Sequence, residues 1–156
     1  MKRQILTALA LSVATATSVA AQDMIKATDP LGMAIALRDL GYKATLDKDT
    51  LGDPMIVSKA QGLNFVILFY DCTDNADCRS IQYSSSFTLT DGIDPNTLNA
   101  WNLDKRYAKT YINDEGEIYL KYDVNLDGGG IQLETFKDNF DIWDSLLGEF
   151  KDHIDF

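Results

Sequence analysis

The chain has 156 residues, an apolar content of 46% and a formal net charge of −10 at pH 7. This composition is typical of one globular domain and argues against a disordered or fibrous chain. A surface this acidic repels phosphate backbones and anionic lipids, which disfavours binding to nucleic acid or to a membrane surface. The single histidine, His153, leaves little material for zinc binding or general-base catalysis.

Residues 1–21 have the three parts of a secretory signal peptide. Lys2 and Arg3 form a basic start, an apolar run rich in Ser and Thr follows, and small residues at 19–21 provide a cleavage site. The run is too short and too polar for a membrane anchor. We expect the leader to be removed, leaving residues 22–156 as a single domain, free of the membrane, in the periplasm or the medium.

Turn and capping signals divide the next part of the chain into one helix and two short strands. Asp29-Pro30 is a typical helix start, because an acidic N-cap precedes a proline whose missing N–H costs nothing there. Gly41 is typical of a helix end. Residues 42–46 and 55–59 are predicted to be short strands, joined by a segment rich in turn-forming residues.

Two longer strand-like runs flank a pair of cysteines. Residues 65–70 are consecutively apolar, which predicts a central strand covered on both faces. Residues 80–88 alternate, which predicts a strand with one buried face. Between them lie Cys72 and Cys78, which in an oxidising compartment are expected to form a disulfide across a hairpin loop. A redox or metal-binding pair is the alternative, although C-x-x-C spacing is absent.

A second helix and a second hairpin follow the cysteine loop. Asp94-Pro95 repeats the helix-start signal, and a short helix is expected after it. Residues 105–112 and 117–124 are predicted to form a hairpin across the polar turn at 113–116.

The segment from Asp123 to Glu134 matches the pattern of an EF-hand calcium loop. The carboxylate and amide ligands would be Asp123, Asn125, Asp127 and Glu134, with Gly128 at the sharp turn. An EF-hand requires a helix before the loop, and here the alternation predicts a strand. We therefore interpret the segment as a glycine-rich turn and keep calcium binding as an alternative.

The last segment carries the clearest pattern of the chain. Apolar residues spaced by three and four predict a long amphipathic helix that covers the sheet or, alternatively, contacts a partner. These residues are Leu133, Phe136, Phe140, Trp143, Leu147 and Phe150. The predicted fold class is α+β, an antiparallel sheet with three helices in the order α-β-β-β-α-β-β-α.

Sequence signatures of common catalytic sites are absent from the chain. There is no nucleophile elbow, no phosphate-binding loop, no dinucleotide fingerprint and no zinc-protease motif. His153 is expected to be an exposed histidine in a fraying tail. The acidic loop residues Asp71, Asp74 and Asp77 are interpreted as turn formers, with a cation site as the alternative. We expect neither enzymatic activity nor a cofactor.

Residues 98–123 carry a motif that resembles the YbjN-domain family, bacterial proteins grouped as candidate regulators of sensory transduction. The motif is an Asn-x-Trp-Asn block, a basic-aromatic pair, an Asp-Glu-Gly turn and a strand ending in Asp. Its residues are Asn99, Trp101, Asn102, Arg106, Tyr107 and Asp123. The resemblance extends over residues 27–150 and implies a fold similar to type III secretion chaperones, no known catalytic activity, and protein binding, often as a dimer.

The motif residues also have a physical interpretation of their own. Trp101 is expected to pack between the second helix and the sheet, and Asn102 to cap the end of that helix. Arg106 would open the next strand and pair with an acid or face a ligand. We therefore expect an exported, non-catalytic module that binds a protein, a peptide or a second copy of itself. The alternatives are a small-ligand or calcium-binding module and a small hydrolase.

Overall fold

The structure is a computed structural model that describes residues 23–156, so the predicted leader lies outside the described residues. Three helices and eight strands follow one another, in agreement with the predicted α+β class. In chain order they are β1 (Met24–Ile25), α1 (Pro30–Asp39), β2 (Ala44–Lys48), β3 (Pro54–Ala60), β4 (Leu63–Tyr70), β5 (Ser80–Phe87), α2 (Pro95–Asp104), β6 (Lys109–Ile112), β7 (Ile118–Asn125), β8 (Ile131–Gln132) and α3 (Leu133–His153).

The number of strands differs from the predicted order in two places. Four strands, one for each strand-like run, lie between α1 and α2, where the order α-β-β-β-α-β-β-α has three. The two-residue strands β1 and β8, which pair with each other, were not expected because two residues are too short to show a period. None of the helices among residues 23–156 combines the length and apolar content that a bilayer crossing requires.

Six strands form one antiparallel sheet in the order β2-β3-β4-β5-β7-β6. The last pair is unequal in length, because β6 has four residues and β7 has eight. Their pairing runs from Ile112↔Ile118 to Lys109↔Lys121. The remaining stretch of β7, residues 122–125, therefore extends beyond the start of β6 along this side of the sheet.

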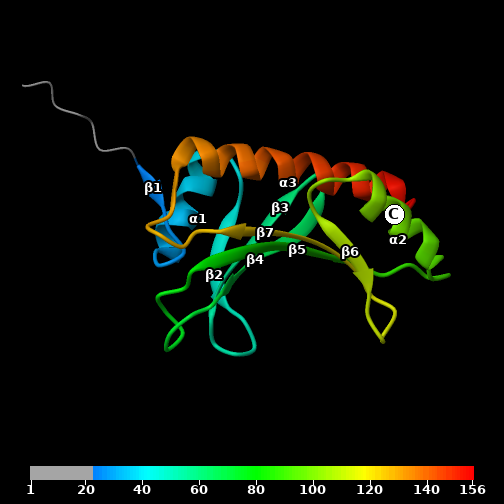
Figure 1. Cartoon of the computed structure of the whole chain (residues 1–156), viewed down its shortest axis with the longest axis horizontal. Coiled ribbons are helices and arrows are strands. Elements are labelled where there is room, and N and C mark those ends of the chain that lie inside the picture. The colour runs from blue at the N-terminus through cyan, green and yellow to red at the C-terminus, as the bar shows by residue number, and fades with distance from the viewer. Residues whose placement is uncertain (1–22) are drawn as a thin grey trace, which may run out of the picture.

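Helix α3 runs along one face of the sheet and forms the centre of the core (Figure 1). The predicted apolar stripe is confirmed for Phe136, Phe140, Trp143, Leu147 and Phe150, which are all fully buried, while Leu133 at its start is half-buried. The rings of Phe140, Trp143 and Phe150 contact the inward-facing aromatic residues of β4 and β5 with centroid separations of 5.3 to 6.2 Å. Helix α1 covers the same face over β2 and β3.

The opposite face of the sheet has no helix over it in the described part of the chain (Figure 1). The prediction that residues 65–70 are covered on both faces is therefore wrong. Phe65, Ile67 and Phe69 are buried against the helices, whereas Val66 and Leu68 on the other face are only half-buried. The continuous apolar run reflects an apolar strip on the open face rather than a second layer.

Both helix starts follow the predicted capping chemistry. Asp29 Oδ1 accepts a hydrogen bond from the Gly32 N–H at 2.9 Å, and Asp94 Oδ1 accepts one from the Asn96 N–H at 2.9 Å. Pro30 and Pro95 occupy the first position of each helix.

The core contains two neighbouring tyrosines with opposite hydrogen-bonding states, which predicts opposite effects of losing each hydroxyl. Tyr83 is fully buried between Tyr122 and Trp143, and its hydroxyl has no hydrogen-bond partner among residues 23–156. Because a buried hydroxyl without a partner costs desolvation energy, we expect Tyr83→Phe to raise the free energy of unfolding by about 1 kcal/mol. Urea titration of the oxidised protein measures this change.

The matched control is Tyr122→Phe in the same aromatic stack. The Tyr122 hydroxyl donates to Asn139 Oδ1 at 2.6 Å, so this substitution removes a hydrogen bond and leaves an amide oxygen unpaired. We expect a loss of about 1 kcal/mol. Equal losses for the two variants would contradict the assignment of Tyr83 as unpartnered.

Candidate functional site

Four of the motif residues, Asn102, Arg106, Tyr107 and Asp123, converge on one cavity of about 390 Å³ between α2, β6 and β7. The cavity arises because β6 is shorter than β7. The loop 105–108 lies beside residues 122–125 of β7, which have no pairing partner in β6. The residues that line it are Asn102, Lys105, Arg106, Tyr107, Ala108, Lys109, Lys121, Tyr122 and Asp123. Four of the six motif residues are among them.

Trp101 does not line the cavity, but its contacts hold the loop that does. Its ring is buried and packs edge-on against Phe150 of α3 with a centroid distance of 4.9 Å. It therefore joins α2 to α3, where packing against the sheet was expected. Its indole N–H donates to the Ala108 carbonyl at 3.1 Å. Ala108 has a φ of 56°, a left-handed conformation that alanine rarely adopts, so this bond helps to hold the loop in its shape.

Asn102 holds α2 against β6 through both groups of its side-chain amide. Its Nδ2 donates to the Thr110 carbonyl at 3.0 Å, and its Oδ1 accepts from the Thr110 N–H at 2.9 Å. The prediction that Asn102 caps the end of α2 is therefore wrong. The side chain points toward β6 and pairs with its outer edge as a neighbouring strand would.

Arg106 and Tyr107 lie in the loop before β6 rather than at the start of a strand. The predicted strand from residue 105 is interrupted because Ala108 is left-handed, and β6 begins at Lys109. The Arg106 guanidinium donates through Nη2 to the Tyr107 hydroxyl at 2.6 Å and lies 4.8 Å from that ring's centroid. Within residues 23–156 it makes no ion pair with a carboxylate.

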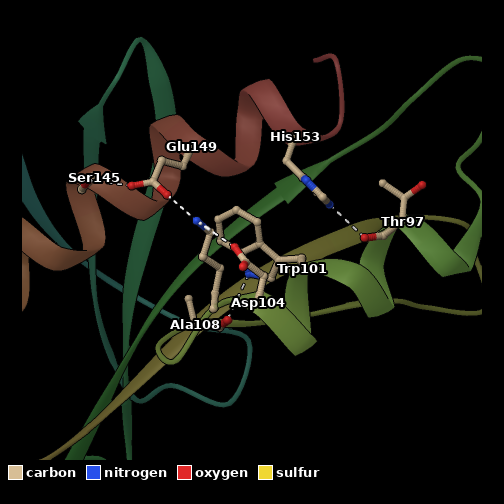
Figure 2. A network of polar contacts seen from close by, with 8 residues as sticks. Thr97, Trp101, Asp104, Ala108, Ser145, Glu149 and His153 are labelled. Atoms are coloured by element: carbon tan, nitrogen blue, oxygen red, sulfur yellow. Dashed lines mark hydrogen bonds and ion pairs between the residues drawn. The ribbon is translucent and has the colours of Figure 1, made fainter.

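A polar network fastens α2 to the C-terminal end of α3 (Figure 2). Lys105 Nζ lies 2.8 Å from Glu149 and 3.2 Å from Asp104. The hydrogen bond from Lys105 holds the pKa of Glu149 below its usual value. His153 is exposed, as expected, but it does not lie in a frayed tail. It belongs to the last turn of α3, and its Nε2 donates to the Thr97 carbonyl at 2.9 Å.

Asp123 closes the cavity on the β7 side. Burial tends to raise the pKa of its carboxyl, but hydrogen bonds from Lys109 and Gln82 outweigh burial and lower it. The Lys109 ammonium lies 2.8 Å from Asp123 Oδ2. Asn99, by contrast, is exposed on α2, and its side chain makes no hydrogen bond to the described residues.

The four candidate calcium ligands do not form a cluster. Asp123 and Asn125 lie on β7, Asn125 accepts a hydrogen bond from the Asp127 N–H, and Glu134 belongs to the first turn of α3. No group of three or more acidic, histidine or cysteine side chains that could hold a metal ion occurs among residues 23–156. The residues between β7 and α3 form a turn with Gly128, Gly129 and Gly130 at positive φ, followed by the short β8.

The cysteine loop is a hairpin closed by the disulfide between Cys72 and Cys78, whose Cα atoms are 3.8 Å apart. Thr73 and Ala76 exchange two backbone hydrogen bonds, and the two residues between them have positive φ. Positive φ favours Asp and Asn, so the backbone conformation of this turn explains why the loop is acidic. The prominent acids are Asp71, Asp74 and Asp77, all at positive φ.

The open face of the sheet is a second candidate surface. Two apolar cross-strand pairs lie on it side by side, Val57↔Val66 and Met55↔Leu68, and all four side chains are half-buried. We call these four residues the apolar strip.

The two asparagines of the motif predict different costs of substitution. Replacing Asn102 by Ala removes both hydrogen bonds to Thr110, so we expect the free energy of unfolding to fall by about 1 to 2 kcal/mol. Asn99→Ala on the same helix removes no hydrogen bond, and we expect a change within about 0.5 kcal/mol. Chemical denaturation of both variants measures the difference, and equal effects would contradict the role assigned to Asn102.

The lowered pKa of Asp123 predicts an acid-dependent contribution to stability. A carboxyl whose folded-state pKa is depressed stabilises the protein above its unfolded pKa and ceases to do so as the pH falls through the folded value. Because the ion pair with Lys109 is exposed, we expect Asp123→Asn to cost less than about 1 kcal/mol at neutral pH. That difference from the wild type should shrink from about pH 6 to about pH 2 in urea titrations, and a constant difference would contradict it.

Comparison with known proteins places this arrangement in a family. No curated protein and no solved structure matches the chain. Residues 32–156 match the model of the YbjN family, which is described as "Putative bacterial sensory transduction regulator". The matched range contains the whole cavity and both surfaces of the sheet, and the family is described as a regulator rather than as an enzyme. The chain belongs to the YbjN family.

Proposed function

We propose that this chain is an exported, non-catalytic regulatory module that binds a protein or peptide partner on the open face of its sheet. Membership of a family described as regulators supports a binding role. The observation that carries the proposal is the one-sided cover of the sheet, which leaves the apolar strip facing outward (Figure 1). Apolar surface left outward on a folded domain marks interaction sites.

The open face has the anatomy of a protein interface. The apolar strip occupies its middle, and exposed polar or amphipathic side chains border it, namely Asp47, Lys59 and Tyr70. An apolar centre inside a polar rim excludes water from the contacts that contribute most to affinity.

The disulfide loop helps to fix one end of this face. Asn75 at its tip donates through Nδ2 to the Leu51 carbonyl at 3.2 Å and to Asp53 Oδ1 at 2.8 Å. Both acceptors belong to the connection between β2 and β3, so the two loops are fastened to each other. A partner then meets a surface that is already ordered, which reduces the entropy lost on binding.

Export is supported by the leader pattern together with the cysteine pair. Residues 1–21 carry the three parts of a signal peptide, and the two cysteines of the chain are joined to each other. Structural disulfides persist in oxidising compartments and are rare in the cytosol. The proposed location is the periplasm or the medium.

The proposal predicts a contact that depends on the apolar strip. A photo-crosslinking amino acid placed at Leu68 in the full chain, expressed in the bacterium that makes it, should yield one discrete adduct. The double variant Val57→Thr/Val66→Thr keeps side chains of nearly the same shape and strand preference but adds two hydroxyls. We expect it to lower the adduct yield at least about tenfold, because two apolar contacts are lost.

The control position for the crosslinker is Leu103 on α2, which is 90% exposed and lies away from the strip. Equal adducts from Leu103 and Leu68, or an adduct unaffected by the double variant, would contradict the proposal. An adduct that joins two copies of the chain, with a dimer mass in light scattering, would identify the partner as a second copy.

A further inference from the structure

The cavity between α2, β6 and β7 concentrates positive charge on an acidic protein. Four of the 14 lysines and arginines line it, although the chain as a whole carries a formal net charge of −10. They are Lys105, Arg106, Lys109 and Lys121, and Asp123 is the one carboxylate that lines the cavity with them. This local excess of positive charge attracts anions that the rest of the surface repels.

Two of these cations have carboxylate partners and two do not. Lys105 pairs with Asp104 and Glu149, and Lys109 pairs with Asp123. Arg106 and Lys121 make no ion pair with the described residues and contact tyrosine side chains instead. The Lys121 ammonium lies 5.4 Å from the ring centroids of both Tyr111 and Tyr119. The Lys121 charge also attracts Asp123 and helps to lower the pKa of that carboxyl, so it is partly compensated, whereas Arg106 has no carboxylate partner among the described residues.

The loop that presents Arg106 is held from both ends. Trp101 bonds the Ala108 carbonyl, Asn102 bonds both backbone groups of Thr110, and the Lys105 N–H donates to the Trp101 carbonyl at 2.9 Å. Ala108 keeps a left-handed conformation within this framework. Strained backbone that is held in place by surrounding contacts occurs preferentially at ligand-binding sites.

We propose that this cavity binds a small ligand through an oxyanion group, a carboxylate or a phosphate. The Arg106 guanidinium offers a planar pair of N–H donors that matches two oxygens of such a group, and the Lys121 side chain adds a second positive charge to the lining. The volume of about 390 Å³ accommodates a small molecule, and the Tyr107 and Tyr122 side chains supply apolar walls. The site shares no residue with the apolar strip, although Lys121 and Asp123 lie on the same open face two strands away, and separate variants test the two sites.

The test is a titration of the purified, oxidised chain with two probes in separate arms, inorganic phosphate and acetate. Ionic strength is held constant with chloride so that general screening does not change. Proton–nitrogen correlation spectra report the amides of residues 105–110 and the Arg106 side chain. We expect saturable shifts confined to these groups. Arg106→Gln should weaken binding about tenfold, because a charge-assisted hydrogen bond is lost, while Lys137→Gln on α3 should leave it unchanged.

Each outcome decides the proposal. Saturation by phosphate alone or acetate alone supports it and identifies the oxyanion, and saturation by both supports a site with general oxyanion affinity. An unfolding titration of Arg106→Gln establishes that any loss of binding is not a loss of folding. Shifts spread over the whole surface, no saturation with either probe, or equal affinities for Arg106→Gln and the wild type would overturn it. Loss of crosslinking at Leu68 has no bearing on this result.

Discussion

The contact between the aromatic stripe of α3 and one face of the sheet determines the rest of the structure. Five side chains on a single helix are fully buried in this contact, and the rings of Phe140, Trp143 and Phe150 pack against β4 and β5. Helix α1 covers the same face, and within residues 23–156 no helix lies over the other face. The apolar strip of β3 and β4 remains outward as a direct result. The same helix, through Phe150, also fixes α2 and thereby the loop that shapes the cavity.

The elements with strong local signals could be predicted from the sequence. The two Asp-Pro sequences predicted both capped helices, and the apolar spacing of three and four from Leu133 to Phe150 predicted α3 and its buried face. The apolar run at 65–70 led to the wrong prediction of a strand covered on both faces. A continuous apolar run does not reveal whether the second face of the strand is covered by the protein itself or remains open. The start of β6 was misplaced by four residues because the left-handed conformation of Ala108 is imposed by tertiary contacts and has no local signal in an alanine.

The candidate site depends on pairings that no local pattern encodes. The resemblance selected the correct region, and four of its residues line the cavity, but the roles of two were different from those expected. Asn102 bonds a strand eight residues away instead of its own helix end, and Trp101 packs on a helix almost 50 residues away. Lys121 was not singled out, since its place in the cavity follows from the register of β6 with β7. The alternation of β7 predicts that Lys121 lies on the open face of the sheet, but it does not predict that Lys121 lines the same cavity as Arg106.

Side chains cover part of the backbone edge at each end of the sheet. At the β6 end, the Asn102 amide occupies both backbone groups of Thr110. At the β2 end, side-chain bonds reach the Ala44 carbonyl and the Lys48 N–H, and Leu46 between them is exposed. Side-chain hydrogen bonds therefore occupy part of the backbone edge at both ends of the sheet, which reduces the number of free backbone groups that a strand of another chain could pair with.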